Sequence, residues 1–66
     1  MKHERITVDP RIMVGKPVTK GTRMPVEQII RELAGGMTIA DIMDAHPRLT
    51  PDNIYAAAEY AADTIP

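Results

Sequence analysis

The fold is decided by residues 25–36, which read PVEQIIRELAGG. Apolar side chains recur there at positions 26, 29, 30 and 33, which is the spacing of one face of an α-helix. Pro25 suits the first helical position, where its missing N–H is not needed. The pair Gly35-Gly36 ends the pattern, because one glycine can take the left-handed conformation that caps a helix. The sequence therefore predicts a helix over residues 25–34.

A second, shorter helix is predicted over residues 38–45. Thr38 and Asp41 have the spacing of a capping box, with aspartate in place of the usual glutamate. Pro47 stops the helical pattern, since the residue before a proline is pushed out of the helical region. A helix this short depends on packing against its neighbours for its stability.

A third helix is predicted over residues 50–65, with an alanine-rich apolar side. Thr50 is the expected N-cap and Pro51 the first helical residue. The second and third helices are separated by a tight corner, a pattern typical of helix-turn-helix proteins. Asn53 is the one side chain of the third helix suited to contact with a base edge, but its first-turn position favours a role in the cap.

The N-terminal part, residues 1–24, is predicted to contain short extended segments. Residues 6–8 are a brief strand, and residues 12–14 are a second apolar run. Residues 16–21 are expected to be extended or turn-like, because of Pro17. A ribbon of this size is not stable alone in water, so it must pack on the helices or on another chain.

These segments together predict one domain that is mainly α. A basic β-like arm over residues 1–24 precedes a three-helix bundle over residues 25–66. A chain of 66 residues without cysteine has a modest core and no disulfide, so association, as a homodimer or with a partner, is expected to stabilise it. No signal-peptide pattern and no membrane-spanning stretch is visible, so a cytoplasmic location without membrane contact is the expectation.

The net charge of −1 hides an asymmetry between the arm and the body. Residues 1–24 carry six basic and two acidic side chains, and residues 25–66 carry two basic and seven acidic ones. The arm therefore has residues suited to phosphate contacts, and the DNA-binding candidates are Arg5, Arg11, Lys16, Lys20 and Arg23. An alternative is that arm and body simply attract each other within a dimer.

The third helix argues against direct reading of DNA. Residues 50–65 contain no Lys or Arg, but do contain Asp52, Glu59 and Asp63, which phosphates would repel. An acidic helical face suits a basic protein partner instead. The partner-binding candidates are Tyr55, Glu59, Tyr60 and Asp63.

Catalytic chemistry is not indicated. The chain has no cysteine and no serine, and His3 is expected in a mobile tail. Asp41 and Asp44 share a helix face and, with His46, suggest a metal site, but such a pair is more often a solvated surface. The interaction of His46 with the dipole of a helix end is the simpler interpretation. We expect no enzyme activity, no metal, no cofactor and no small-molecule substrate.

The segments Asp9-Pro10, GKPV at 15–18 and GTRMPV at 21–26 resemble the DUF433 family of small bacterial proteins. The resemblance extends over about residues 6–65. Its motif residues here are Gly15, Pro17, Gly21, Thr22, Arg23 and Pro25.

The resemblance implies a homeodomain-like helix-turn-helix bundle and a VapB-like antitoxin in a type II toxin–antitoxin pair. The toxin it implies is a PIN-like ribonuclease, and such antitoxins dimerise and repress their own operon. The antitoxin hypothesis is therefore our first interpretation. The alternative is a protein–protein adaptor, or a stand-alone dimeric regulator, with a degenerate helix-turn-helix and no DNA role.

The motif also has a physical interpretation. Gly21 suits a turn with positive φ, and Thr22 is expected to hydrogen-bond the local backbone before the helix. Arg23 suits a two-pronged contact with a carboxylate or a phosphate. The sequence leaves open whether this segment is an elbow that defines the fold or a direct ligand contact.

Overall fold

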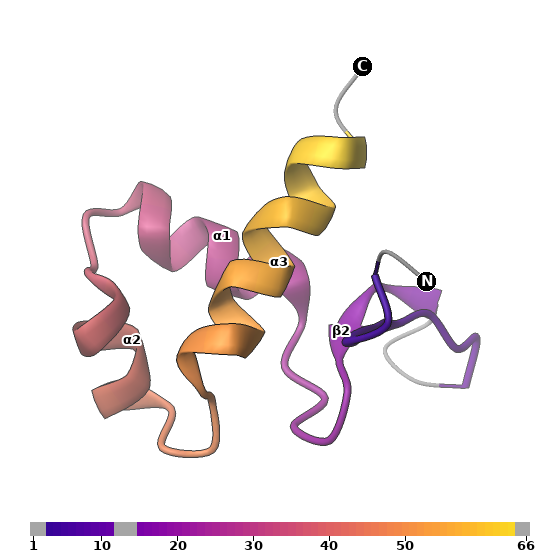
Figure 1. Cartoon of the computed structure of the whole chain (residues 1–66), viewed down its shortest axis with the longest axis horizontal. Helices are drawn as coiled ribbons and strands as arrows, with labels where there is room; N and C mark the ends of the chain where they lie inside the picture. Colours follow the sequence, from indigo (N-terminus) through magenta and orange to yellow (C-terminus); the bar gives the residue numbers. More distant parts are fainter. Residues whose placement is uncertain (1–2, 12–14, 65–66) are drawn as a thin grey trace.

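The structure, a computed structural model, describes residues 3–11 and 15–64. Two short strands come first and three helices follow, and the last helix crosses the first (Figure 1). The elements are β1 (Ile6–Thr7), β2 (Val18–Thr19), α1 (Val26–Ala34), α2 (Ile39–Ala45) and α3 (Pro51–Thr64). The prediction of a mainly helical chain with a β-like arm is confirmed.

The two strands form an antiparallel ribbon in which Ile6 pairs with Thr19 and Thr7 with Val18. The first strand is one residue shorter than the predicted 6–8. The second lies inside the segment expected to be extended or turn-like, and the predicted run at 12–14 lies outside the described residues. Val18 and Thr19 form the strand because both side chains are fully buried against the rest of the fold.

Helix α1 begins one residue later than predicted. Pro25 is its N-cap and has an extended backbone with ψ of 133°, because it also forms a β-bridge with Val18. At the other end Gly35 stays right-handed, whereas Gly36 has a φ of +99°. One glycine of the pair is therefore left-handed, as predicted.

Helix α2 is held at its start by the predicted capping box. Thr38 Oγ1 accepts a hydrogen bond from the backbone N–H of Asp41 at 3.1 Å, and Asp41 Oδ2 accepts one from the N–H of Thr38 at 3.0 Å. The bond from the backbone of Thr38 lowers the pKa of Asp41. Asp41 thus belongs to the cap of α2.

Helix α3 begins with a second reciprocal cap. Asn53 Oδ1 accepts hydrogen bonds from the backbone N–H of Thr50 at 3.0 Å and from its hydroxyl at 2.9 Å. The N–H of Asn53 donates to Thr50 Oγ1 at 3.3 Å. Asn53 is only 7% exposed, so its cap role is confirmed.

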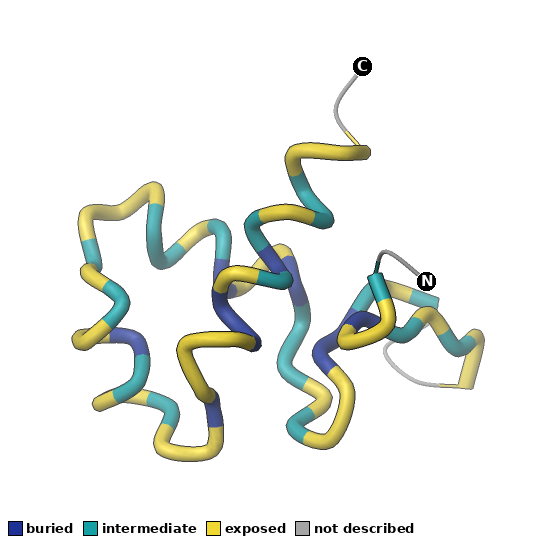
Figure 2. The backbone as a smooth tube through the Cα atoms, in the orientation of Figure 1, coloured by how far each residue is buried: buried dark blue, intermediate teal, exposed yellow. Residues whose placement is uncertain are grey.

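The core is aliphatic and lies where the three helices and the ribbon meet. The buried positions are on the inward sides of these elements (Figure 2). The central hydrophobic cluster consists of Ile6, Val26, Ile29, Ile42, Leu49, Ile54 and Ala57. Because Ile6 of β1 belongs to this cluster, the ribbon packs on the helices of its own chain. Within the described residues, no helix is long and apolar enough to cross a membrane.

Candidate functional site

Two basic side chains of the arm pair with acidic side chains of the body of the same chain. Arg5 Nη2 lies 3.7 Å from Asp52 Oδ2, and Lys16 Nζ lies 2.7 Å from Glu27 Oε1. The hydrogen bond from Lys16 lowers the pKa of Glu27. The sequence left open an attraction between arm and body within a dimer; the structure shows these two contacts within one chain. These pairs are exposed, so each contributes little to stability and can exchange with solvent.

Arg11 is engaged within the arm itself. Its Nε and Nη2 donate to the two carboxylate oxygens of Asp9 at 3.1 Å and 2.9 Å. The side-chain hydrogen bonds from Arg11 are the main reason that the pKa of Asp9 lies below its usual value. Three of the five predicted DNA-binding residues, Arg5, Arg11 and Lys16, therefore have a carboxylate partner.

Basic side chains other than these three are available for binding. Within residues 3–11 and 15–64, the Lys and Arg side chains that make no ion pair are Lys20, Arg23 and Arg48. The first two lie on the loop between β2 and α1, and the third lies on the corner between α2 and α3.

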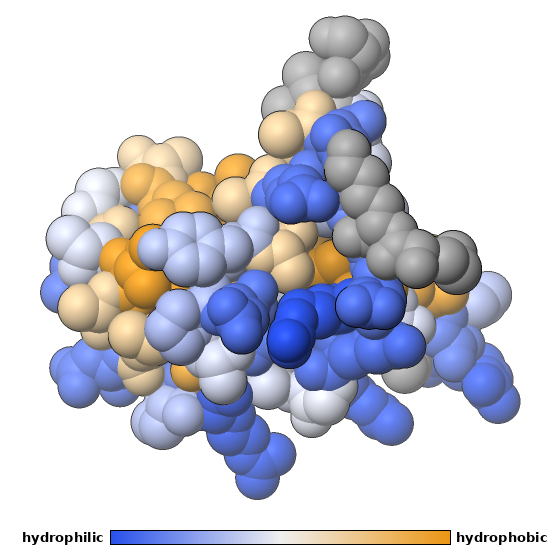
Figure 3. Space-filling view, viewed as in Figure 1, coloured by the Kyte–Doolittle hydropathy of each residue, from blue (hydrophilic) through white to orange (hydrophobic). Residues whose placement is uncertain are grey.

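These two loops are neighbours in space. Thr22 and Met24 of the first loop line a shallow hollow with residues 45–49 of the second, and both loops lie at the lower edge of Figure 1. Hydrophilic side chains dominate that edge (Figure 3). Sequence reasoning did not single out Arg48, although its place in the corner before the third helix was a usable signal. We name Lys20, Arg23 and Arg48 the loop cations.

The motif segment before α1 is a tight elbow. Gly21 has a φ of +82°, as predicted, and Arg23 is a non-glycine residue with a φ of +55°. The N–H of Arg23 donates to the carbonyl of Thr19 at 2.8 Å. The hydroxyl of Thr22 bonds the hydroxyl of Thr19, so the expected bond to the backbone is replaced by one to a buried side chain. The elbow holds the exposed Arg23 at the loop edge.

The structure divides the predicted partner-binding residues between two sides of α3. Tyr55 is 60% exposed and lines a polar hollow with Glu59 and Asp52. Tyr60 is half-buried and packs against the core. The two tyrosines therefore line different surfaces. Asp63 contacts His3, with Oδ2 2.9 Å from Nε2.

Tyr60 also lines an apolar groove that sequence reasoning missed. The groove has a volume of about 410 Å³ and lies between α1, the end of α3 and the segment before β2. Its apolar lining is Pro17, Val26, Ile30, Tyr60 and Ala61. The groove exists only because α1 packs across α3, so no local sequence pattern predicts it.

His46 lies at the end of a helix, as expected, but its side chain also contacts a neighbouring helix. It is the C-cap of α2, but its Nε2 also lies 2.9 Å from both carboxylate oxygens of Glu32 on α1. Since Asp41 is used by the cap and His46 faces Glu32, the structure does not bring together the Asp41, Asp44 and His46 group considered from the sequence.

The fold and these surfaces define a small, mainly helical domain with a two-stranded antiparallel ribbon at its N-terminal side. The family model described as "Protein of unknown function (DUF433)" matches residues 6–61. The chain belongs to this family.

Relatives and a solved structure agree with that assignment. The uncharacterised protein y4eO of Sinorhizobium fredii is 36% identical over 58 residues, which are 88% of this chain and 26% of that protein. An uncharacterised protein of Archaeoglobus fulgidus is 61% identical over 28 residues, 42% of this chain and 78% of its own length. The chain thus spans about a quarter of the Sinorhizobium relative.

The crystal structure of a DUF433 member from Anabaena variabilis has the same fold, with a TM-score of 0.85 at 23% identity. The match covers 91% of this chain and 59% of the other.

Proposed function

We propose that this protein is an antitoxin-like binding module of the helix-turn-helix type. In this proposal the exposed face of α3 binds and neutralises a PIN-like ribonuclease toxin, and the loop end contacts the DNA of its own operon. Membership of the DUF433 family and the corner between α2 and α3 support the proposal.

The observation that carries the proposal is the separation of two surfaces. The loops that carry Lys20, Arg23 and Arg48 lie at the lower edge of Figure 1, whereas Tyr55 and Glu59 lie exposed along α3. A module that binds a basic protein and a polyanion needs such a separation, because each surface attracts only one of the two partners.

The α3 surface suits a basic partner. A ribonuclease needs cationic side chains to hold the phosphates of its substrate, and acidic side chains can occupy the same positions. Tyr55 is the large exposed aromatic residue on this face, and tyrosines are enriched among the residues that dominate interface energies. Tyr55 is thus the proposed anchor, and Glu59 supplies the charge.

The DNA contact would be made by the loop cations with phosphates and not by α3 with base edges. Asn53, the side chain of α3 best suited to a base, is buried in the cap. Asp52 at the start of α3 is exposed and acidic, which disfavours insertion of this end into a groove. Phosphate contacts position a protein on DNA without reading its sequence.

The partner half is tested by co-expression with the adjacent open reading frame. We expect that neighbour alone to stop growth and this chain to co-purify with it and restore growth. Tyr55→Ala should weaken the complex by about thirtyfold or more, since truncating an interface hot spot costs about 2 kcal/mol or more.

Asp44→Ala is the matched control, because Asp44 is exposed on α2, away from Tyr55. A neighbour without toxicity, or a complex that tolerates Tyr55→Ala, would remove the proposed interface.

The DNA half is tested with the triple variant Lys20→Ala, Arg23→Ala and Arg48→Ala. We expect duplex DNA from upstream of the gene to bind about tenfold more weakly to it at moderate salt. The slope of log affinity against log salt should fall by about 2.7, since each phosphate contact contributes about 0.9. Arg31→Ala is the control, because this exposed arginine lines the groove between α1 and α3 and lies 4.0 Å from Glu27.

A second candidate function is a protein–protein adaptor, or a dimeric regulator, without a DNA role. The acidic character of α3 and the apolar groove beside Tyr60 favour it. Wild-type protein that binds no DNA in the same titration, while still holding its protein partner, would establish this alternative.

A further inference from the structure

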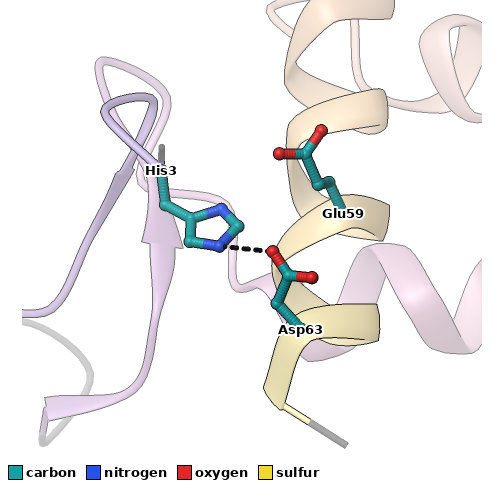
Figure 4. Close-up of side chains that lie close together, drawn as sticks. All are labelled: His3, Glu59 and Asp63. Carbon is teal, nitrogen blue, oxygen red and sulfur yellow. Dashed lines mark ion pairs between the residues drawn. The ribbon is translucent and has the colours of Figure 1, made fainter. Parts of the chain in front are cut away.

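His3 of the arm lies against the last turns of α3, next to two carboxylates. Its Nε2 is 2.9 Å from Asp63 Oδ2. One ligand atom from each of His3, Glu59 and Asp63 can be chosen so that all three lie within 4.8 Å of one another. Figure 4 shows the imidazole pointing from the arm toward the two acidic side chains of the helix.

The arrangement follows from local structure on both sides. Glu59 and Asp63 are four positions apart on α3, so their side chains share one face of the helix. The His3 ring is 5.1 Å from the ring of Tyr60 and inclined to it at 77°. This edge contact holds the imidazole beside the helix, and the His3 side chain is 25% exposed. The expectation of a mobile tail at His3 is therefore wrong.

We propose that His3, Glu59 and Asp63 bind a divalent transition-metal ion of the Zn²⁺ type. An imidazole nitrogen with two carboxylate oxygens is a ligand set that Zn²⁺ accepts, with water in the fourth tetrahedral position. Mg²⁺ and Ca²⁺ prefer sites made of oxygen alone, so the imidazole selects against them. The inference does not depend on the proposed antitoxin role.

The geometry requires only a small adjustment. Ligands at about 2.0–2.2 Å from a tetrahedral Zn²⁺ lie about 3.3–3.6 Å from one another. The longest separation, within 4.8 Å, closes by rotation of exposed carboxylate side chains. The two charges of the ion would balance the two carboxylates.

Binding would fasten the arm to α3. The ligands come from positions far apart in the sequence, so the ion would join the arm to the last turns of the final helix. An ion that binds only the folded state stabilises it in proportion to the logarithm of its concentration above Kd. Because a small domain without disulfides has a low stability, a metal link of this kind should raise its Tm measurably.

The test is calorimetric titration of untagged, chelator-treated protein with Zn²⁺, together with thermal unfolding. We expect one ion per chain and a Tm that rises with Zn²⁺ concentration, but no rise with the same concentration of Mg²⁺ or Ca²⁺. Co²⁺ should show the intense visible absorption of a tetrahedral site. His3→Gln, Glu59→Gln and Asp63→Asn should each weaken binding by about tenfold or more.

His46→Gln is the matched control, because His46 also faces a carboxylate, Glu32, and should leave binding unchanged. Circular dichroism confirms that each variant retains its helices. The proposal is overturned if Zn²⁺ gives no saturable binding, if His3→Gln binds as tightly as the wild type, or if the His46 variant is the one that loses the ion.

Discussion

Ile29→Ala is expected to lower the free energy of unfolding by about 2–5 kcal/mol, the range for removing a large aliphatic side chain from a core. Ile29 is 0% exposed and lies in the middle of α1, facing the central cluster. A domain of 66 residues has a total stability of about 3–10 kcal/mol. The change therefore removes a large part of the stability and lowers the urea concentration at the unfolding midpoint.

The cavity is the main cause of this loss. Alanine is the better helix former, but that advantage is only about 0.5 kcal/mol. It does not offset the loss of contacts from a side chain that is enclosed by α1, α3 and the ribbon. The measurement is urea unfolding followed by circular dichroism at 222 nm, a standard wavelength for helix content.

Ile30→Ala is the matched control for this prediction, because the same side chain is removed from the next position. Ile30 is half-buried and lines the open groove beside Tyr60. We expect its loss to be less than half of that at Ile29. Equal losses at the two positions would show that the groove is closed in solution, for example by association.

The helices were predictable because their signals are local. The spacing of Val26, Ile29 and Ile30 fixes the inner face of α1, and the two reciprocal caps at Thr38 and Thr50 are each encoded within four residues. Propensity, periodicity and capping all act along the chain, so one sequence is enough to place such elements to within a residue or two.

The pairing of the ribbon was not predictable in the same way. The sequence predicts two further segments after the first strand, an apolar run at 12–14 and an extended or turn-like stretch at 16–21, and neither has a strong alternation of polar and apolar residues. The choice of Val18–Thr19 depends on burial against the helices and on the bridge to Pro25. These are contacts between distant residues, which a local pattern does not contain.

The sequence shows that basic side chains are concentrated in the arm and acidic ones in the body, but it does not show which of them pair in the fold. Counting charges gives a basic arm and an acidic body, and it does not show that Arg5 and Lys16 lie beside Asp52 and Glu27. Folding brings these opposite charges together and leaves the loop cations for other contacts. Arg48 joins them because the α2–α3 corner lies beside the elbow, which only the tertiary structure shows.

Ala57→Leu is the second prediction with a large effect. Ala57 is 0% exposed and belongs to the core cluster, and its helix α3 makes the most extensive helix contact in the structure, with α1. Leucine adds three carbon atoms at a place without room for them. Overpacking of this kind costs about 1–3 kcal/mol, which for a domain of this size lowers Tm by about 4–8 °C for each kcal/mol.

Ala62→Leu isolates the effect of packing, because Ala62 is exposed on the same helix. Leucine and alanine have similar helix propensities, so the free energy of unfolding should change by less than about 0.5 kcal/mol. The alanine-rich sequence of α3 does not show which alanine is the contact, and this pair of variants distinguishes them. If Ala57→Leu raised Tm, α1 and α3 would have to be farther apart than the structure places them, and the groove beside Tyr60 would change with them.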